Sequence, residues 1–336
     1  MLSDNQSASR RSGKRFVDRW HYAPSVPVAT SPVFVWPPRP LAALAWVAKS
    51  WFVLTEQSIL IVICLVSWMF FTPDPETARV LAWDWPLEIL IRNLVLMMMV
   101  AGGLHLFFYI LRRQKSDLQY DTRSLSDQKK VFTFGSQVRD NMFWSLASGV
   151  TLWSCYETVV LWAMANDYAP VHNWVDGPIY FVALFALIPI WISFHFYWVH
   201  RWMHWPPLYR LAHAVHHRNV NVGPWSGLSM HPIETLLFFS SVLIHLVIAS
   251  HPLHILFHLS HQGLTAATSH TGFEAFKAGD KRFIALGRFH HQIHHRYFDC
   301  NYGNLEMPWD KLFGSFHDGT DVAHEAMKQR KLKRSV

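Results

Sequence analysis

Residues 193–218 read SFHFYWVHRWMHWPPLYRLAHAVHHR, and their histidines fall at helical spacings. His200 and His204 are four residues apart, and a second group lies at 213, 216 and 217. Residues three and four apart share one face of a helix, so each group would present its imidazoles side by side. Pro206 and Pro207 between the groups cannot continue a helix, so we expect the chain to turn there and bring the second helix back toward the first. The pattern recurs at 291, 294 and 295 and predicts a metal site.

The composition is that of a membrane protein. Of the 336 residues, 51% are hydrophobic and 16% are charged, whereas a soluble domain has roughly 25% charged residues. The net charge of +7 comes from basic residues beside apolar segments, which favours anionic lipid headgroups and argues against nucleic acid as a partner. The chain has three cysteines and no CxxC motif, so imidazoles are the expected metal ligands.

Four apolar segments are long enough to cross a bilayer as helices, which takes about 20 residues. They lie at about 51–71, 87–111, 141–165 and 178–200. The tail before the first segment and the loop after the second are rich in Lys and Arg, which predicts that both lie in the cytoplasm. The fourth span would then emerge on that side with the first histidine pair, and the basic C-terminus agrees. The membrane would be a bacterial inner membrane or the endoplasmic reticulum.

Two further apolar runs, at 235–249 and 253–264, are each too short to span, so we expect a re-entrant hairpin. The predicted fold class is all-α: a polytopic membrane helical bundle of about four spanning helices plus the hairpin, with a cytosolic His-rich cap. The expected divisions are a flexible, basic and Pro-rich tail over 1–40, transmembrane helices with a cytosolic loop over 41–189, a His-rich catalytic domain over 190–319, and a basic C-terminal tail over 320–336.

The number of histidines bears on the metal. More imidazoles gather than one tetrahedral zinc can use, so two metal ions are implied. Imidazole binds Zn, Cu, Fe and Ni alike, but a redox-active pair next to lipid could activate oxygen and take hydrogen from an unactivated C–H bond, which no side chain does alone. Two alternatives stay open at this point: a non-enzymatic electron carrier with bis-His haem, and a zinc-dependent membrane enzyme or transporter.

Six motifs together resemble one known family, the fatty acid hydroxylase and sterol desaturase superfamily of membrane di-iron oxygenases. They are FYWVHRWMH (196–204), LYRLAHAVHH (208–217), MHPIE (230–234), SHTGFE (269–274), HHQIHH (290–295) and NYGNLEMPWDKLFGSFHDG (301–319). The resemblance implies a helical membrane bundle with a His-lined cytosolic cap. It also implies hydroxylation or desaturation of a lipid, with O2 as co-substrate and electrons from an external donor.

The resemblance further implies which side chains hold the two iron ions. The implied ligands are His200, His204, His213, His216, His217, His270, His291, His294 and His295. Residues expected to orient these ligands or to add to them are His195, His231, His258, His261, His290, Glu234, Glu274 and Asp310. Many members carry an acidic residue a few positions before the Tyr-Trp of the first motif, where this chain has Ser193 and His195.

Partners follow from what the sequence lacks and from its charges. We find no GxGxxG after a strand, no phosphate-binding loop and no cytochrome-like haem domain, so we expect electrons to come from another protein. A ferredoxin or a cytochrome b5-type protein would serve as the donor. Basic residues near the histidines, such as Arg201 and Arg210, would suit an acidic partner, although lipid headgroups are an alternative.

Overall fold

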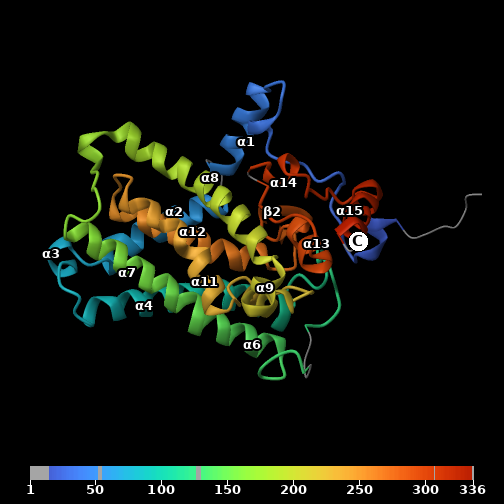
Figure 1. Cartoon of the computed structure of the whole chain (residues 1–336), viewed down its shortest axis with the longest axis horizontal. Coiled ribbons are helices and arrows are strands. Elements are labelled where there is room, and N and C mark those ends of the chain that lie inside the picture. The colour runs from blue at the N-terminus through green and yellow to red at the C-terminus, as the bar shows by residue number, and fades with distance from the viewer. Residues whose placement is uncertain (1–14, 52–54, 126–129, 306, 335–336) are drawn as a thin grey trace, which may run out of the picture.

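The computed structural model describes residues 15–51, 55–125, 130–305 and 307–334, and it is mostly helical (Figure 1). The longer helices are α1 (Pro40–Trp51), α2 (Glu56–Phe71), α4 (Asp84–Met97), α6 (Gln137–Trp144), α7 (Thr151–Ala165), α8 (Pro178–Met203), α11 (Pro232–Phe239), α12 (Pro252–Ser269), α13 (Phe289–Tyr297) and α15 (Asp321–Arg334). Short helices between them are α3 (Pro75–Ala78), α5 (Gly103–His105), α9 (Pro206–Leu208), α10 (Ala214–His217) and α14 (Trp309–Leu312). The all-α prediction missed one antiparallel hairpin, β1 (Ala275–Ala278) and β2 (Lys281–Ala285).

Two stretches of helix among the described residues are long and apolar enough to cross a membrane. One runs from Asp84 to Ile110 through α4 and α5, and the other is α8. Both coincide with predicted spans. The other two predicted spans correspond to α2, which has 16 residues, and to the helical stretch of α6 and α7, where Asn141 and Glu157 are buried. The helical membrane architecture is therefore supported by two spans, and the count of four is not confirmed.

The centre of the bundle is α12, which packs against α2, α7 and α8 (Figure 1). Most of its side chains are buried, including those of Phe257 and Leu259. The segment predicted as a re-entrant hairpin forms α11, a 3-10 turn at Ser240–Leu246, and α12. With 18 residues, α12 is longer than the predicted second arm and lies inside the bundle.

Prolines start the helices that carry or face the histidines. The helix α8 ends at Met203 and α9 begins at Pro206, as the double proline predicts. Pro232 and Pro252 begin α11 and α12, where a missing N–H costs no helical hydrogen bond. These breaks fold the chain into a cap at one end of the bundle, formed by residues 204–231 and 270–305 (Figure 1).

Residues 15–34 of the predicted flexible tail lie on the cap instead. Phe16 and Trp20 are buried, and their rings contact Tyr297, His317 and Phe289. The prediction of flexibility is wrong for this part, because two large aromatic side chains gain enough by burial to order the segment that carries them. Residues 1–14 of that tail lie outside the described residues. The predicted basic C-terminal tail forms α15, whose Met327 is also buried.

Candidate metal centre

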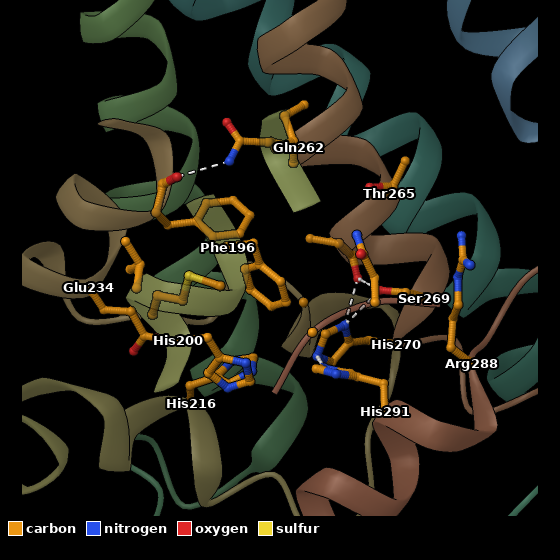
Figure 2. A pocket seen from close by; sticks show the side chains of 18 of the residues that line it. Phe196, His200, His216, Glu234, Gln262, Thr265, Ser269, His270, Arg288 and His291 are labelled. Atoms are coloured by element: carbon orange, nitrogen blue, oxygen red, sulfur yellow. Dashed lines mark hydrogen bonds between the residues drawn. The ribbon is translucent and has the colours of Figure 1, made fainter. Parts of the chain in front are cut away.

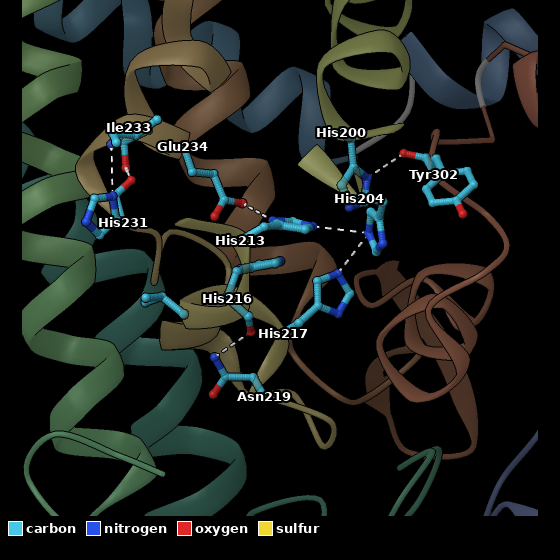
Figure 3. Close-up of polar contacts among 12 residues, drawn as sticks. His200, His204, His213, His216, His217, Asn219, His231, Ile233, Glu234 and Tyr302 are labelled. Atoms are coloured by element: carbon cyan, nitrogen blue, oxygen red, sulfur yellow. Dashed lines mark hydrogen bonds and ion pairs between the residues drawn. The ribbon is translucent and has the colours of Figure 1, made fainter. Parts of the chain in front are cut away.

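Five histidines converge on one point at the junction of the bundle and the cap, and Figure 3 shows the four that come from residues 200–217. They are His200 and His204 from the end of α8, His213 and His217 from the returning segment, and His294 from α13. The Nε2 atom of His204 lies 3.1 Å from Nε2 of His213, 3.1 Å from Nε2 of His217 and 3.2 Å from Nε2 of His294. We call this set cluster A.

Four other histidines form cluster B: His216, His270, His291 and His295. The Nε2 atom of His270 lies 3.0 Å from Nε2 of His295 and 3.1 Å from Nε2 of His291. All four side chains are buried. His216 and His217 are consecutive in α10, and each belongs to a different cluster. The two clusters therefore lie side by side.

The outer ring nitrogens are held by oxygen atoms of the protein. Nδ1 of His200 donates to the Tyr302 carbonyl at 2.6 Å, and Nδ1 of His294 donates to the Cys300 carbonyl at 2.6 Å. Nδ1 of His270 donates to the Ala266 carbonyl at 2.7 Å. A carbonyl oxygen only accepts, so the proton of each neutral ring sits on Nδ1 and the lone pair on Nε2 points into the cluster.

This geometry fits bound metal ions. Burial, followed by repulsion from neighbouring imidazoles, holds the pKa of His213, His217 and His294 well below its ordinary value, so these rings are neutral at pH 7 and ready to coordinate. Converging lone pairs repel one another unless a cation lies between them. Two nitrogens that each lie about 2.1 Å from one ion at nearly a right angle would be about 3 Å apart. The Nε2 atoms of His204, His213, His217 and His294 in cluster A, and those of His270, His291 and His295 in cluster B, include pairs with that spacing.

Glu234, which we expected to orient an imidazole, lies beside one of the clustered histidines. Its Oε1 lies 2.7 Å from Nδ1 of His213, and both side chains are buried (Figure 3). The parallel prediction for Glu274 is wrong, because the structure pairs that carboxylate with Arg282 at 2.9 Å and with the Tyr22 hydroxyl. Glu274 follows a glycine turn that directs the chain into β1, away from the imidazoles.

The remaining predicted residues surround the clusters without joining them. Nε2 of His290 contacts the Gly303 carbonyl at 2.9 Å, so this buried ring supports the cap. His231 accepts the N–H of Ile233 at the start of α11. The other three lie in the bundle: His195 contacts Ser240, His258 contacts Ser241 and His245, and His261 contacts Gln57.

The loop at 300–303 positions the ligands, a role that the sequence left vague. Carbonyls of Cys300, Tyr302 and Gly303 hold three imidazoles, and the Asp310 carboxylate accepts the backbone N–H groups of Tyr302 and Gly303 at 2.9 and 2.7 Å. Asp310 therefore acts on the loop and not directly on an imidazole. The motif was visible in the sequence, but backbone carbonyls leave no residue-type signal.

Both clusters face one cavity in the bundle. Its walls include apolar side chains of α8, α11 and α12, among them Ile192, Phe196 and Phe238. Figure 2 shows His200, His216, His270 and His291 together at one end, with Gln262 toward the other. An apolar molecule in this cavity would therefore lie against imidazoles of both clusters.

Comparison with known proteins agrees with the geometry. Residues 185–315 match the model of the fatty acid hydroxylase family. The Delta(7)-sterol 5(6)-desaturase ERG3 of Candida albicans is 32% identical over 128 residues, which cover 37% of this chain and 32% of that protein. The lathosterol oxidase of Homo sapiens is 26% identical over 267 residues, which cover 76% of this chain and 84% of that protein. No solved structure matches the chain significantly.

The matches concentrate on the segment that holds the clusters. The alignment covers about a third of the length of the fungal desaturases that match first. All nine clustered histidines lie within the matched range of 185–315. The predicted resemblance to the fatty acid hydroxylase and sterol desaturase superfamily is therefore confirmed over this segment, because the family model and the sterol desaturase relatives both match the part of the chain that carries the paired histidine clusters.

Proposed function

We propose that this protein is a membrane-bound di-iron oxygenase that hydroxylates or desaturates a lipid, using O2 and electrons from an external donor. The observation that carries the proposal is the apolar cavity, because imidazoles of both clusters line it. The relatives support it: their names describe desaturation of a Delta(7)-sterol and oxidation of lathosterol. The catalytic unit would be the segment over 190–319.

In this proposal cluster A holds one iron ion and cluster B the other, with the nine histidines as ligands. The ions would supply the oxygen activation needed to break an unactivated C–H bond. The protein's own contribution is position and exclusion of water. Glu234 and the carbonyls of the 300–303 loop orient the imidazoles, while Phe196 and Phe238 keep the chamber apolar.

The side of the membrane is also part of the proposal. Lys and Arg are abundant in the loop over 112–139 and at 328–334, which favours a cytoplasmic location for the clusters and both termini. A soluble electron donor, of the ferredoxin or cytochrome b5 type, would then reach the cap. His204 is the one member of the two clusters that is only partly buried, and a surface groove reaches it beside Arg201 and Trp205.

The spacing of the clusters bears on the alternatives. A haem between two imidazoles would need their nitrogens about 4 Å apart, whereas the Nε2 contacts in cluster A are 3.0–3.2 Å. This spacing is an argument against a bis-His haem carrier. A zinc enzyme would use the same imidazoles, so metal analysis has to separate it from the iron proposal.

The test uses the purified full chain and cells that express it. We expect two iron ions per chain and an O2-dependent change in one lipid class relative to cells without the gene. The His204→Ala variant should behave like the deletion, and His258→Ala, which lies outside both clusters, should retain its metal. Zinc in place of iron, or lipid conversion that persists without O2 or in His204→Ala, would reject the proposal.

A further inference from the structure

A second cavity lies beside the one that reaches the clusters, and we call it the vestibule. Its walls come from Val28 and Phe34 of the N-terminal segment, Ala186 and Pro189 of α8, and Phe283 of β2. Ala186 and Pro189 lie in the middle of a helix long enough to cross a membrane. The vestibule is therefore placed where a lipid could enter sideways from the bilayer.

Polar side chains separate the vestibule from the catalytic cavity. Arg288 lines both cavities, and its Nη2 atom lies 3.9 Å from Oε2 of Glu56, which lines the vestibule. Nε2 of Gln57, on the vestibule side, lies 2.9 Å from Nε2 of His261, on the catalytic side. These two contacts form a narrow polar boundary between largely apolar spaces, and we call it the neck.

The neck lies next to cluster B. The backbone N–H of Arg288 donates to the Ser269 carbonyl at 3.3 Å, and Ser269 precedes the cluster residue His270. Figure 2 shows the Arg288 side chain at the edge of the cavity, beside Ser269 and His291. A polar group held at the neck would thus leave the apolar body of the same molecule directed toward the imidazoles.

The chemistry of the neck selects among polar groups. The Glu56 carboxylate accepts the hydroxyl of Thr268 and lies opposite the Arg288 guanidinium, and both charged side chains are only partly exposed. An alcohol can donate to the carboxylate and accept from the guanidinium at the same time. A carboxylate ligand would meet Arg288 but would be repelled by Glu56. The pair therefore matches an uncharged hydroxyl better than an acid.

We infer that Glu56 and Arg288 form the headgroup site for the substrate, and that they bind the hydroxyl of a lipid alcohol as it passes from the vestibule to the clusters. This inference rests on the proposed function only in calling the lipid a substrate. The binding of the hydroxyl at Glu56 and Arg288 does not depend on that function. It assigns Glu56 and Arg288 as specificity-determining residues, distinct from the metal ligands.

Binding can be measured on the full chain in detergent without metal, by energy transfer from tryptophan to the fluorescent sterol dehydroergosterol. The comparison ligands are its 3-deoxy analogue, read in the same way, and oleate, read by its displacement of the fluorescent sterol. We expect the protein to prefer the sterol over the deoxy analogue by about tenfold or more, which is the value of a hydrogen bond to a charged group. Arg288→Met should remove most of that preference. The matched control is Arg282→Met, because Arg282 also pairs with a glutamate but lines neither cavity.

A second variant separates recognition from a structural role. Glu56→Gln keeps an acceptor for the hydroxyl, so sterol binding should change less than threefold. The same variant removes the charge that repels an acid, so we expect oleate to bind about tenfold more tightly. If Glu56 had a purely structural role, the substitution would weaken the binding of both the sterol and oleate. Each variant is also loaded with iron, and an unchanged metal content shows that the clusters remain folded.

The outcomes are distinct. Three results would overturn the headgroup site. The Arg288→Met variant could keep its preference for the sterol over the deoxy analogue, or Arg282→Met could lose as much of that preference as Arg288→Met. The wild-type protein could also bind oleate more tightly than the sterol. The proposed function is judged separately by iron content and O2-dependent lipid conversion. A protein that converts a lipid but shows no hydroxyl preference would refute only this inference, and one that shows the preference but binds no iron would refute only the oxygenase.

Discussion

At the scale of single residues, the clustered histidines differ in the acceptor that holds their outer nitrogen. His200, His270 and His294 donate to backbone carbonyls, whereas His213 donates to the buried carboxylate of Glu234. A side chain can be replaced without moving the backbone, so this one contact allows a direct test of ligand orientation. Groups of this kind fix the ring and its tautomer, and their loss typically lowers metal affinity 10–100-fold.

We therefore expect Glu234→Ala to lower the affinity of cluster A for metal by about 10–100-fold, because His213 loses the partner that holds Nδ1–H. The measurement is competition for iron against a chelator of known affinity, with the metal content of each variant determined directly. Glu274→Ala is the matched control, since Glu274 pairs with Arg282 and belongs to neither cluster. Equal effects of the two substitutions would contradict the assigned role of Glu234.

The residue scale also shows what the sequence could not supply. Helical spacing was enough to group His213, His216 and His217 on one short segment, but it could not divide them between two clusters. That division depends on which neighbour each ring faces after the chain turns at Pro206. Glu234 and Glu274 look alike in sequence, because each follows a histidine by three or four residues, and only packing distinguishes their partners.

At the scale of elements, a close approach between a loop and α12 positions cluster B. A Cβ added at Gly227 would lie 2.1 Å from the carbonyl oxygen of Ala266, which is the same atom that accepts Nδ1–H of His270. The loop that follows α10 is thus fitted against the carbonyl that orients a cluster residue. Only glycine permits this distance.

Gly227→Ala should therefore destabilise the protein by about 1–3 kcal/mol and weaken metal binding at cluster B, because the Ala266 carbonyl has to move. Thermal unfolding in detergent and iron content measure the two effects. Gly103→Ala serves as the control, since a Cβ there meets nothing within 4 Å and alanine favours helix. A stable Gly227→Ala protein with full metal content would show that the loop adapts without disturbing His270.

Docking of the N-terminal segment on the cap should depend on pH through His317. This ring is buried against Phe16, and its Nδ1 accepts the N–H of Gly319 at 3.1 Å, so protonation would break that bond. Burial lowers the pKa of His317 to about 4, below the value of about 6.5 in an unfolded chain. Its contribution to stability is therefore complete above pH 6.5 and is lost as the pH falls toward 4.

Limited proteolysis near Arg15 at pH 7.5 and pH 5.0 checks this expectation. Cleavage should rise at the lower pH in the wild-type chain and rise less in His317→Gln, which cannot take up the proton. The comparison with the variant is needed because other buried histidines titrate in the same range. Identical pH profiles for the two proteins would exclude His317 as the group responsible.

At the scale of the whole molecule, the sequence predicted the helical fold and the prolines at which helices begin. It predicted only some of the membrane spans. The length of the apolar runs identified two candidate spans, from Asp84 to Ile110 and α8. These two helices also expose much of their surface, as spans in contact with lipid would. Apolar length failed to indicate that α12 is the buried centre, since the short apolar run over 253–264 has the same pattern whether lipid or protein surrounds it. Likewise, composition suggested a flexible tail where two aromatic residues dock on the cap.

Charged residues inside the bundle give the last prediction. Arg92 of α4 and Glu157 of α7 form a buried ion pair, which Asn93 extends by donating to the Glu157 carboxylate at 3.2 Å. The Arg92 guanidinium also donates to the Phe71 carbonyl at the end of α2, at 3.1 Å. The pair thus ties together three helices, far along the chain from every clustered histidine. Removing one partner of a buried pair typically costs about 3–5 kcal/mol, because the other charge is left without compensation.

Arg92→Met should therefore lower the unfolding temperature in detergent strongly, whereas Arg92→Met combined with Glu157→Leu should recover most of the loss, since both charges are then replaced by apolar side chains of similar size. Iron content of the folded fraction should stay unchanged in both proteins, because neither residue lies in the cap. If the double variant is as unstable as the single one, the pair is needed as an ion pair. If Arg92→Met also loses its metal while it remains folded, the bundle and the clusters are coupled more tightly than their contacts indicate.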